Sequence, residues 1–177
     1  MKRLRSTKVW ALLGLLLLGL FGLDAAATSY RSDAALQKQF SAHEADFEKL
    51  VQMAEEDIHL VRIARDFTWL DTDVSWPRKD VGLSEDRWNE YRRLFRSAGI
   101  PDGINKDVNP PKILFPIVAR GFVPASQEKG IAFSSVALGP VLKSLDKKPP
   151  DELYDKRGYV VVFKPIKDHW YIYYQEF

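Results

Sequence analysis

Hydrophobic and polar positions follow a helical spacing in the first part of the chain. Between Ser32 and Phe67 there is no Gly or Pro, and Ser32 followed by Asp33 is typical of a helix start with an acidic first turn. One helix over this stretch would be about 54 Å long, more than a compact domain of this size covers. We therefore expect it to break or to protrude, and the capping-box spacing of Ser41 and Glu44 predicts a restart there.

The apolar positions of this stretch indicate how the helix packs. A strict heptad seam would contain three polar residues, whereas a stripe with a 3.6-residue period is continuous. We favour a helix that packs on its own domain over the alternative of a coiled coil. The stripe consists of Phe47, Val51, Ala54, Ile58 and Val61.

A second helix has clear signals at both ends. Ser84 is the expected N-cap, Glu85 and Asp86 lie in the first turn, and Gly99 marks the exit. Between these ends, apolar residues recur at helical spacing. They are Trp88, Tyr91, Leu94 and Phe95.

From Lys112 onward the chain changes to short apolar runs separated by turn residues. The β-branched and aromatic content of these runs predicts strands joined by the turns PASQEKG and IKD. Pro116 and Pro165 are expected at an edge, a bulge or a strand end. We also expect a short helical turn from Pro140 to Asp146. The runs are KILFPIVARGFV, GIAFSSVAL, GYVVVFKP and HWYIYYQEF.

Helices followed by strands predict an α+β fold. We expect N-terminal helices packed on one face of a small C-terminal antiparallel sheet of three to four strands. Residues 28–177 are expected to form this single domain. Their nine Phe, four Trp and seven Tyr can fill one core.

The last run has apolar residues on both faces. In a strand, Trp170, Ile172 and Tyr174 share one face with Glu176, and the opposite face carries His169, Tyr171, Tyr173, Gln175 and Phe177. We interpret this run mainly as a core strand. The alternative is that Tyr171 and Tyr173 form a face on which a sugar or peptide stacks.

The first 27 residues have the order of a secretory signal. Four basic residues precede Val9, residues 9–23 are uncharged and rich in Leu, and Ala25 and Ala27 form an A-x-A exit. The apolar stretch is shorter than the roughly 20 residues that span a bilayer comfortably. We expect residues 1–27 to be a cleaved signal peptide or an uncleaved N-terminal membrane anchor.

Both alternatives place the rest of the chain outside the cytoplasm, because the positive flank stays inside. We expect residues 28–177 to be secreted or periplasmic, or tethered to the inner membrane through residues 9–23. The segment holds four of the 26 basic residues and one of the 24 acidic ones, which leaves 22 against 23. The basic pI therefore comes from the segment, and no nucleic-acid partner is expected.

Known catalytic and metal motifs are incomplete in this chain. It has no cysteine, which excludes disulfides and thiolate chemistry. Glu56 and His59 have the spacing of half a carboxylate-bridged metal site, but no second half is present. Asp71 and Asp73 resemble the start of a calcium loop without its Gly and Glu. We expect no cofactor and no metal.

A ligand site is expected where aromatic and charged residues are dense, between Trp69 and Arg93. Tryptophans beside carboxylates and arginines can bind glycans or peptides. The alternative is that the tryptophans are core residues and the charges are solvated. The candidate residues are Trp69, Asp71, Asp73, Trp76, Arg78 and Arg92, with Tyr171 and Tyr173 from the last run.

These patterns predict an exported or membrane-anchored bacterial envelope protein with a non-catalytic binding or structural role. Its partner would be an envelope protein, a peptide or a glycan. The alternative is a small enzyme or enzyme inhibitor that acts on cell-wall glycan or peptide, with Asp71 and Asp73 as its acids. Two carboxyls about 5 to 9.5 Å apart in an open cleft would favour that alternative.

Overall fold

The computed structural model describes residues 31–71, 73–78, 82–122 and 125–177, with only the backbone of 73–78, 122 and 125. Arg31–Phe177 is one compact unit. The expected signal or anchor, residues 1–27, lies outside the described residues. Among the helices that are described, none is long and apolar enough to cross a membrane.

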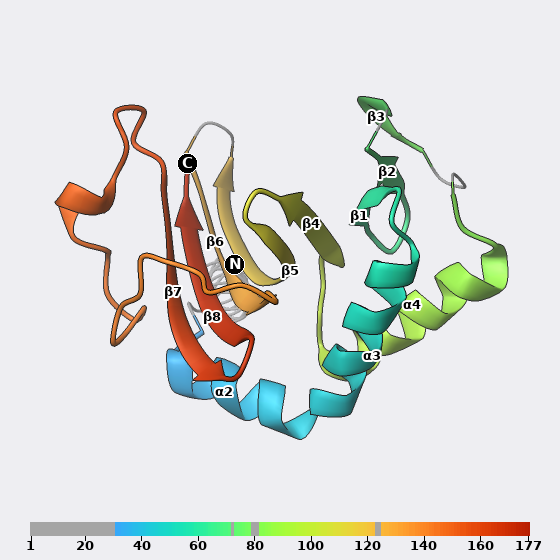
Figure 1. Ribbon diagram of the computed structural model, residues 1–177, viewed down its shortest axis with the longest axis horizontal. Helices are drawn as coiled ribbons and strands as arrows, with labels where there is room; N and C mark the ends of the chain where they lie inside the picture. The colour runs from blue at the N-terminus through green and yellow to red at the C-terminus, as the bar shows by residue number, and fades with distance from the viewer. Residues whose placement is uncertain (1–30, 72, 79–81, 123–124) are drawn as a thin grey trace, which may run out of the picture. The chain divides into compact units, whose positions relative to one another are not determined.

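One curved antiparallel sheet forms most of this unit (Figure 1). Its eight strands are ordered β3-β2-β1-β4-β5-β6-β8-β7. Three α-helices and one short 3-10 helix, η1, complete the described elements. The helices are α2 (Asp33–Ala42), α3 (Glu44–Glu56), α4 (Glu85–Ala98) and η1 (Asp151–Leu153). The strands are β1 (Leu60–Ile63), β2 (Thr68–Leu70), β3 (Asp73–Arg78), β4 (Ile104–Val108), β5 (Pro111–Phe122), β6 (Ala125–Phe133), β7 (Val160–Lys167) and β8 (Trp170–Glu176).

The predicted arrangement of N-terminal helices on one face of a small C-terminal sheet is wrong. The sheet has eight strands instead of three to four, and three of them precede α4 in the chain. The missed strands β1, β2 and β4 have four, three and five residues, and β1 and β4 carry charged side chains. Such short strands are held by their neighbours in the sheet, so their own sequences give little periodic signal.

The helix ends follow local capping chemistry. The Ser32 and Ser84 hydroxyls accept hydrogen bonds from the third backbone N–H of their helices, at 3.2 Å in both cases. Gly99 ends α4 in the left-handed conformation, with φ 68°. The expected break is confirmed, but it falls at His43, between α2 and α3, instead of at Ser41.

The predicted apolar stripe is correct for α3 and fails beyond it. Phe47, Val51 and Ala54 are buried. The helix ends at Glu56, and Ile58 is 65% exposed in the turn that leads to β1. The chain therefore turns into the sheet where the pattern predicted that the helix would continue.

The four predicted C-terminal strands are confirmed as β5 to β8, with differences in bounds. Residues 125–130, expected as part of the turn PASQEKG, begin β6, which ends at Phe133, before the end of the predicted run GIAFSSVAL. Pro116 and Pro165 lie at register shifts, as expected, and Pro165 is on the edge strand β7. The expected helical turn from Pro140 to Asp146 is wrong, because this segment is irregular and pairs with β7 only at Val141.

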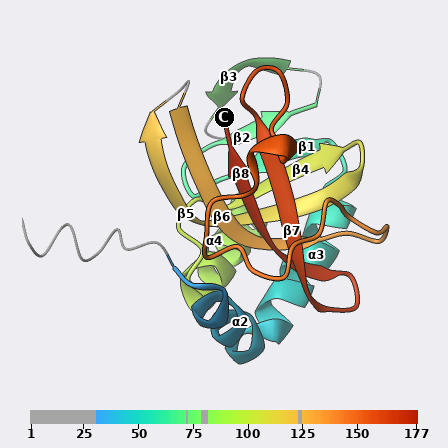
Figure 2. The same cartoon turned by 90° about the vertical axis from the view of Figure 1, so that its left-hand side faces the viewer.

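The predicted face of β8 that carries Trp170 packs on helix side chains. The rings of Phe40 and Trp170 lie 4.8 Å apart, and those of Phe47 and Phe115 lie 5.2 Å apart. Figure 2 shows α2 and α3 together at one end of the strands. Fully burying one such side chain is worth about 1.5–3 kcal/mol. We call this side of the sheet the Trp170 face.

The opposite face is covered in part by the segment that follows β6. Leu138 packs there with Leu114, Phe163 and Tyr173. Tyr173 has no exposed surface. Its ring lies over Gly130 of β6, where an added Cβ would be 2.9 Å from the ring and 2.1 Å from the Phe115 carbonyl oxygen.

A buried ion cluster joins the first turn of α2 to the sheet. Lys129 on β6 is 1% exposed and lies 2.8 Å from the Asp33 carboxylate. Lys164 pairs with the same carboxylate at 2.9 Å, and Asp146 pairs with Lys129 at 2.9 Å. Buried charges persist only when paired in this way. The cluster therefore fixes where α2 begins.

Candidate functional site

On the face of the sheet opposite the Trp170 face, the part that is not covered forms a groove of about 370 Å³. Its lining comes from β1, β2, β4, β5 and β8 and from residues next to β7 and β8. Four strands separate β2 from β8 in the sheet, so the sheet must bend around this groove. The lining residues are Val61, Arg62, Trp69, Asn105, Lys106, Asp107, Leu114, Tyr159, Gln175 and Phe177.

Glu128 of β6 holds one of the lining residues, Gln175, in place. Glu128 pairs with Gln175 across β6 and β8, and the Gln175 amide donates a hydrogen bond to the Glu128 carboxyl at 3.0 Å. The Tyr173 hydroxyl donates a second hydrogen bond to the same oxygen. Burial raises the pKa of Glu128, although the bond from Tyr173 and the charge of Arg62 oppose this shift.

A second polar lining residue is Arg62 of β1. Its guanidinium donates to the Asn105 side-chain oxygen and, at 2.8 Å, to the Asp102 carbonyl. Arg62 and Asn105 are opposite each other in the β1 and β4 ladder, which explains the contact. The Phe67 ring lies 5.9 Å from the guanidinium carbon. Several donors of Arg62 are therefore already satisfied within the protein.

Aromatic rings stand on both sides of the groove. Trp69 pairs with Arg62 in the β1 and β2 ladder and packs at 5.7 Å on Phe67. Tyr159 and Phe177 stack at 5.0 Å on the opposite side, and Phe177 is 52% exposed. The Trp69 indole N–H is buried and has no acceptor among the described residues.

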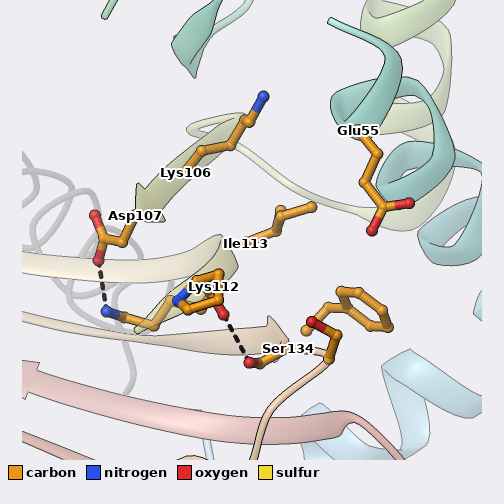
Figure 3. A pocket seen from close by; sticks show the side chains of 9 residues that line it. Glu55, Lys106, Asp107, Lys112, Ile113 and Ser134 are labelled. Carbon is orange, nitrogen blue, oxygen red and sulfur yellow. Dashed lines mark hydrogen bonds and ion pairs between the residues drawn. The ribbon is translucent and has the colours of Figure 1, made fainter. Parts of the chain in front are cut away.

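A smaller pocket lies on the other side of β4, toward the end of α3 (Figure 3). Its volume is about 160 Å³, below the range of about 300–1,000 Å³ that is usual for ligand sites. Its polar groups pair with each other: Lys112 with Asp107 at 2.8 Å, and the Ser134 hydroxyl with the Pro111 carbonyl at 2.7 Å. We therefore regard the groove as the better candidate.

Two wider hollows are lined by histidines. His59 lies 3.7 Å from Asp71 beside a hollow of about 380 Å³. The second hollow, of about 500 Å³, includes His169 and Tyr171. Within the part of the chain that is described, no three His, Asp or Glu side chains gather as a metal site would require.

The structure distributes the predicted site residues instead of gathering them. Trp69 lines the groove, whereas Tyr173 is a buried core residue whose hydroxyl bonds to Glu128. Asp71 and Tyr171 line two different hollows. The side chains of three further candidates lie outside the described residues: Asp73, Trp76 and Arg78.

Arg92 lies on α4 and is occupied locally. Its guanidinium donates to the Arg65 carbonyl at 2.6 Å and stacks on Trp88 at 4.2 Å. Trp88 in turn donates its indole N–H to the Ala64 carbonyl at 2.9 Å. These contacts attach α4 to the segment after β1.

The residues that sequence reasoning missed come from the short strands and the start of β6. The pattern assigned Arg62 to a helix and Glu128 to a turn, and it gave no assignment for the stretch that contains Asn105. The alternation of Arg62 with buried Ile63, and of Asn105 with buried Ile104, was the available signal. It extends over too few residues to identify a strand.

Comparison with protein-family models, curated proteins and solved structures finds no match to this chain.

Proposed function

We propose that this chain is an exported or membrane-anchored binding protein of the bacterial envelope, and that it holds its ligand in the groove without catalysis. The observation that supports binding is the convergence of Arg62, Asn105 and Gln175 from three separate strands between aromatic walls. A concave site with apolar walls and a few oriented polar groups is the usual form of a ligand pocket.

The contacts of these side chains favour binding over chemistry. Each polar group at the base of the groove is held by a neighbour: Arg62 by Asn105, and Gln175 by Glu128. Such fixed side chains are pre-organised for recognition. The alternative of a cell-wall enzyme rests on Asp71 and Asp73, and Asp71 faces an exposed His59 outside the groove.

Extracytoplasmic location is supported by the sequence of the first 27 residues. Residues 1–40 fused to a reporter that is active only outside the cytoplasm should give activity. A matched fusion in which Leu15 to Leu18 are replaced by Asp should give none, because the apolar region is then interrupted. A reporter that stays in the cytoplasm with the native segment would contradict the export proposal.

Binding in the groove can be tested by nuclear magnetic resonance. The ¹⁵N-labelled full chain, in a detergent without a sugar headgroup, would be screened against small neutral, acidic, basic and peptidic fragments. We expect hits to shift the Trp69 indole and the Asn105 and Gln175 amide signals. The indoles of Trp88 and Trp170, which lie elsewhere in the fold, are the internal controls. Hits that shift only those controls would place binding outside the groove.

A further inference from the structure

We infer that the ligand of the groove is a short, uncharged saccharide. This inference rests on the proposed function and adds the chemical class of the ligand. Four features support it: the charged side chains of the groove already have partners, its other polar groups are amides, its walls are aromatic, and the β7 edge of the sheet is partly paired.

The charged side chains of the groove already have hydrogen-bond or ion-pair partners within the protein. Arg62 is held by Asn105 and the Asp102 carbonyl. The Lys106 ammonium reaches the opposite way, to the Ala54 and Asp57 carbonyls at 2.7 and 2.9 Å. Asp107 is paired with Lys112 at 2.8 Å. An ionic ligand would have to displace these hydrogen bonds and the Asp107–Lys112 pair, so a neutral one is favoured.

The two side-chain amides of the groove can hydrogen-bond to the hydroxyls of a ligand. Asn105 and Gln175 have planar amide side chains, which offer both donors and acceptors. A hydroxyl can form a hydrogen bond with either kind of group. Gln175 is only 7% exposed and is fixed by its bond to Glu128. Each amide has one hydrogen bond within the protein, and a purely apolar ligand would leave its other donors and acceptors without partners, at a cost of about 1–3 kcal/mol for each unsatisfied group.

The aromatic walls suit the apolar face of a sugar ring. The Tyr159 and Phe177 rings stack on one side, and Trp69 stands on the other. A pyranose has axial C–H groups on its faces and hydroxyls around its edge. It can therefore lie against a ring while its hydroxyls reach the amides at the base. A groove of about 370 Å³ suits a short saccharide better than a long chain.

An extended peptide is a weaker candidate because it would normally bind by adding a strand to a sheet edge. The middle of the β7 edge is already occupied at Phe163: its N–H donates to the Pro140 carbonyl at 2.9 Å, and the Leu142 N–H donates to its carbonyl at 2.8 Å. Pro165 further along β7 has no N–H to offer. The groove is lined mainly by side chains of strands inside the sheet, whose backbones are already paired, so it offers no free edge to an extended peptide.

The test compares probe classes on the full chain by calorimetry and by the Trp69 indole signal. The saccharide probes are cellobiose, maltose and N,N′-diacetylchitobiose, and the others are trialanine, benzoate and inorganic phosphate. We expect at least one saccharide to bind and to shift the Trp69, Asn105 and Gln175 signals. The other probes should bind at least tenfold more weakly.

Two variants test the residues that carry the inference. Gln175→Leu should weaken saccharide binding at least tenfold, and Phe177→Ala should weaken it about fivefold. Phe177 is half exposed at the end of β8, so its removal leaves the core intact and provides a test even if Gln175→Leu folds poorly. Arg92→Met, outside the groove, is the control and should bind as the parent does.

The outcomes separate the ligand class from the site. Trialanine or an ionic probe that binds in the groove while every saccharide fails would overturn the saccharide inference and leave the proposed function standing. No shift at Trp69, Asn105 or Gln175 with any probe would overturn both. Saccharide binding that Gln175→Leu and Phe177→Ala leave unchanged would place the saccharide site elsewhere.

Discussion

The Tyr173 hydroxyl donates a hydrogen bond to the Glu128 carboxyl beneath the groove, where Tyr173 itself has no exposed surface. This contact joins the buried packing of the sheet to the candidate site. The ring belongs to the apolar cluster with Leu114 and Phe163, and the hydroxyl is the point at which that cluster meets a titratable group. Changes at Glu128 should therefore alter both stability and binding.

Glu128→Gln should make the protein more stable at neutral pH. Burial raises the pKa of Glu128 above its ordinary value of about 4.5, so the folded protein favours the protonated carboxyl. The stability that this proton contributes is fully present below about pH 4.5 and is lost as pH rises through the folded-state pKa. The charges of Asp102 and Asp107 add to this shift, and Arg62 opposes it. Glutamine keeps an acceptor for Tyr173 without the charge.

Urea unfolding from pH 4 to pH 8 would measure this effect. The difference between parent and Glu128→Gln should be small at pH 4 and should grow toward pH 8 in favour of the variant. Glu152→Gln, on an exposed position of η1, is the control and should follow the parent throughout. A variant that is less stable than the parent at pH 8 would contradict the expected direction.

Gly130→Ala should destabilise the fold by about 1–3 kcal/mol or more, because overpacking a tight contact forces the backbone to move. The added methyl would lie 2.1 Å from the Phe115 carbonyl oxygen and 2.9 Å from the Tyr173 ring. Gly139→Ala is the matched control, since no described atom lies within 4 Å of its added Cβ. Equal unfolding midpoints for the two variants would show that Tyr173 does not need the space at Gly130.

Lys129→Met should cost about 3–5 kcal/mol, because it leaves the buried Asp33 carboxylate with less compensation. Lys148→Met removes an exposed partner of Asp151 and should change stability little, because solvent screens this pair. Urea unfolding at pH 7 would compare the two. Similar losses in both variants would show that the buried pair of Lys129 and Asp33 contributes no more to stability than the exposed pair of Lys148 and Asp151.

The Asp33 cluster should also weaken the fold in acid. Burial alone would raise the pKa of Asp33, but hydrogen bonds from Lys129, Leu145 and Lys164 lower it from 3.8 to about 2. The corresponding stability is present above about pH 4 and is lost as pH falls toward 2. The difference in free energy of unfolding between the parent and Asp33→Asn should therefore shrink as pH falls from about 4 toward 2. A constant difference between pH 5 and pH 2 would contradict the lowered pKa.

The sequence was informative where local chemistry decides the structure. Ser84 and Gly99 bound α4 through capping that depends only on adjacent residues. The four aromatic and β-branched runs form strands because each is long enough to show its alternation. Pro116 and Pro165 lie at bulges because proline cannot donate to the ladder.

The groove could not be predicted because it depends on partners that are distant in the chain. Arg62 meets Asn105 only once β1 pairs with β4, and Glu128 meets Gln175 only once β6 pairs with β8. Trp69 was predicted as a site residue because the segment that it begins is dense in aromatic and charged residues. The structure places it beside Arg62 through the ladder of β1 and β2. No local pattern specifies such pairings.

Shortening the chain after Asp168 should abolish folding, because β8 lies between β6 and β7 in the sheet. Trp170 contacts Phe40, Phe47, Phe115 and Phe133. Trp170→Ala alone should cost about 3–5 kcal/mol, against a typical total stability of about 5–15 kcal/mol. Loss of the whole strand would exceed that total.

Substitutions on the other face of β8 should separate a core role from a stacking role. Tyr173→Ala should cost as much as Trp170→Ala, since Tyr173 is fully buried, whereas Tyr171→Ala should cost less because Tyr171 is only partly buried. Urea melts of the three variants and of the shortened chain would give this order. A shortened chain that still unfolds cooperatively near the parent midpoint would show that β8 is an appendage, and its tyrosines would then have to be reconsidered as a ligand surface.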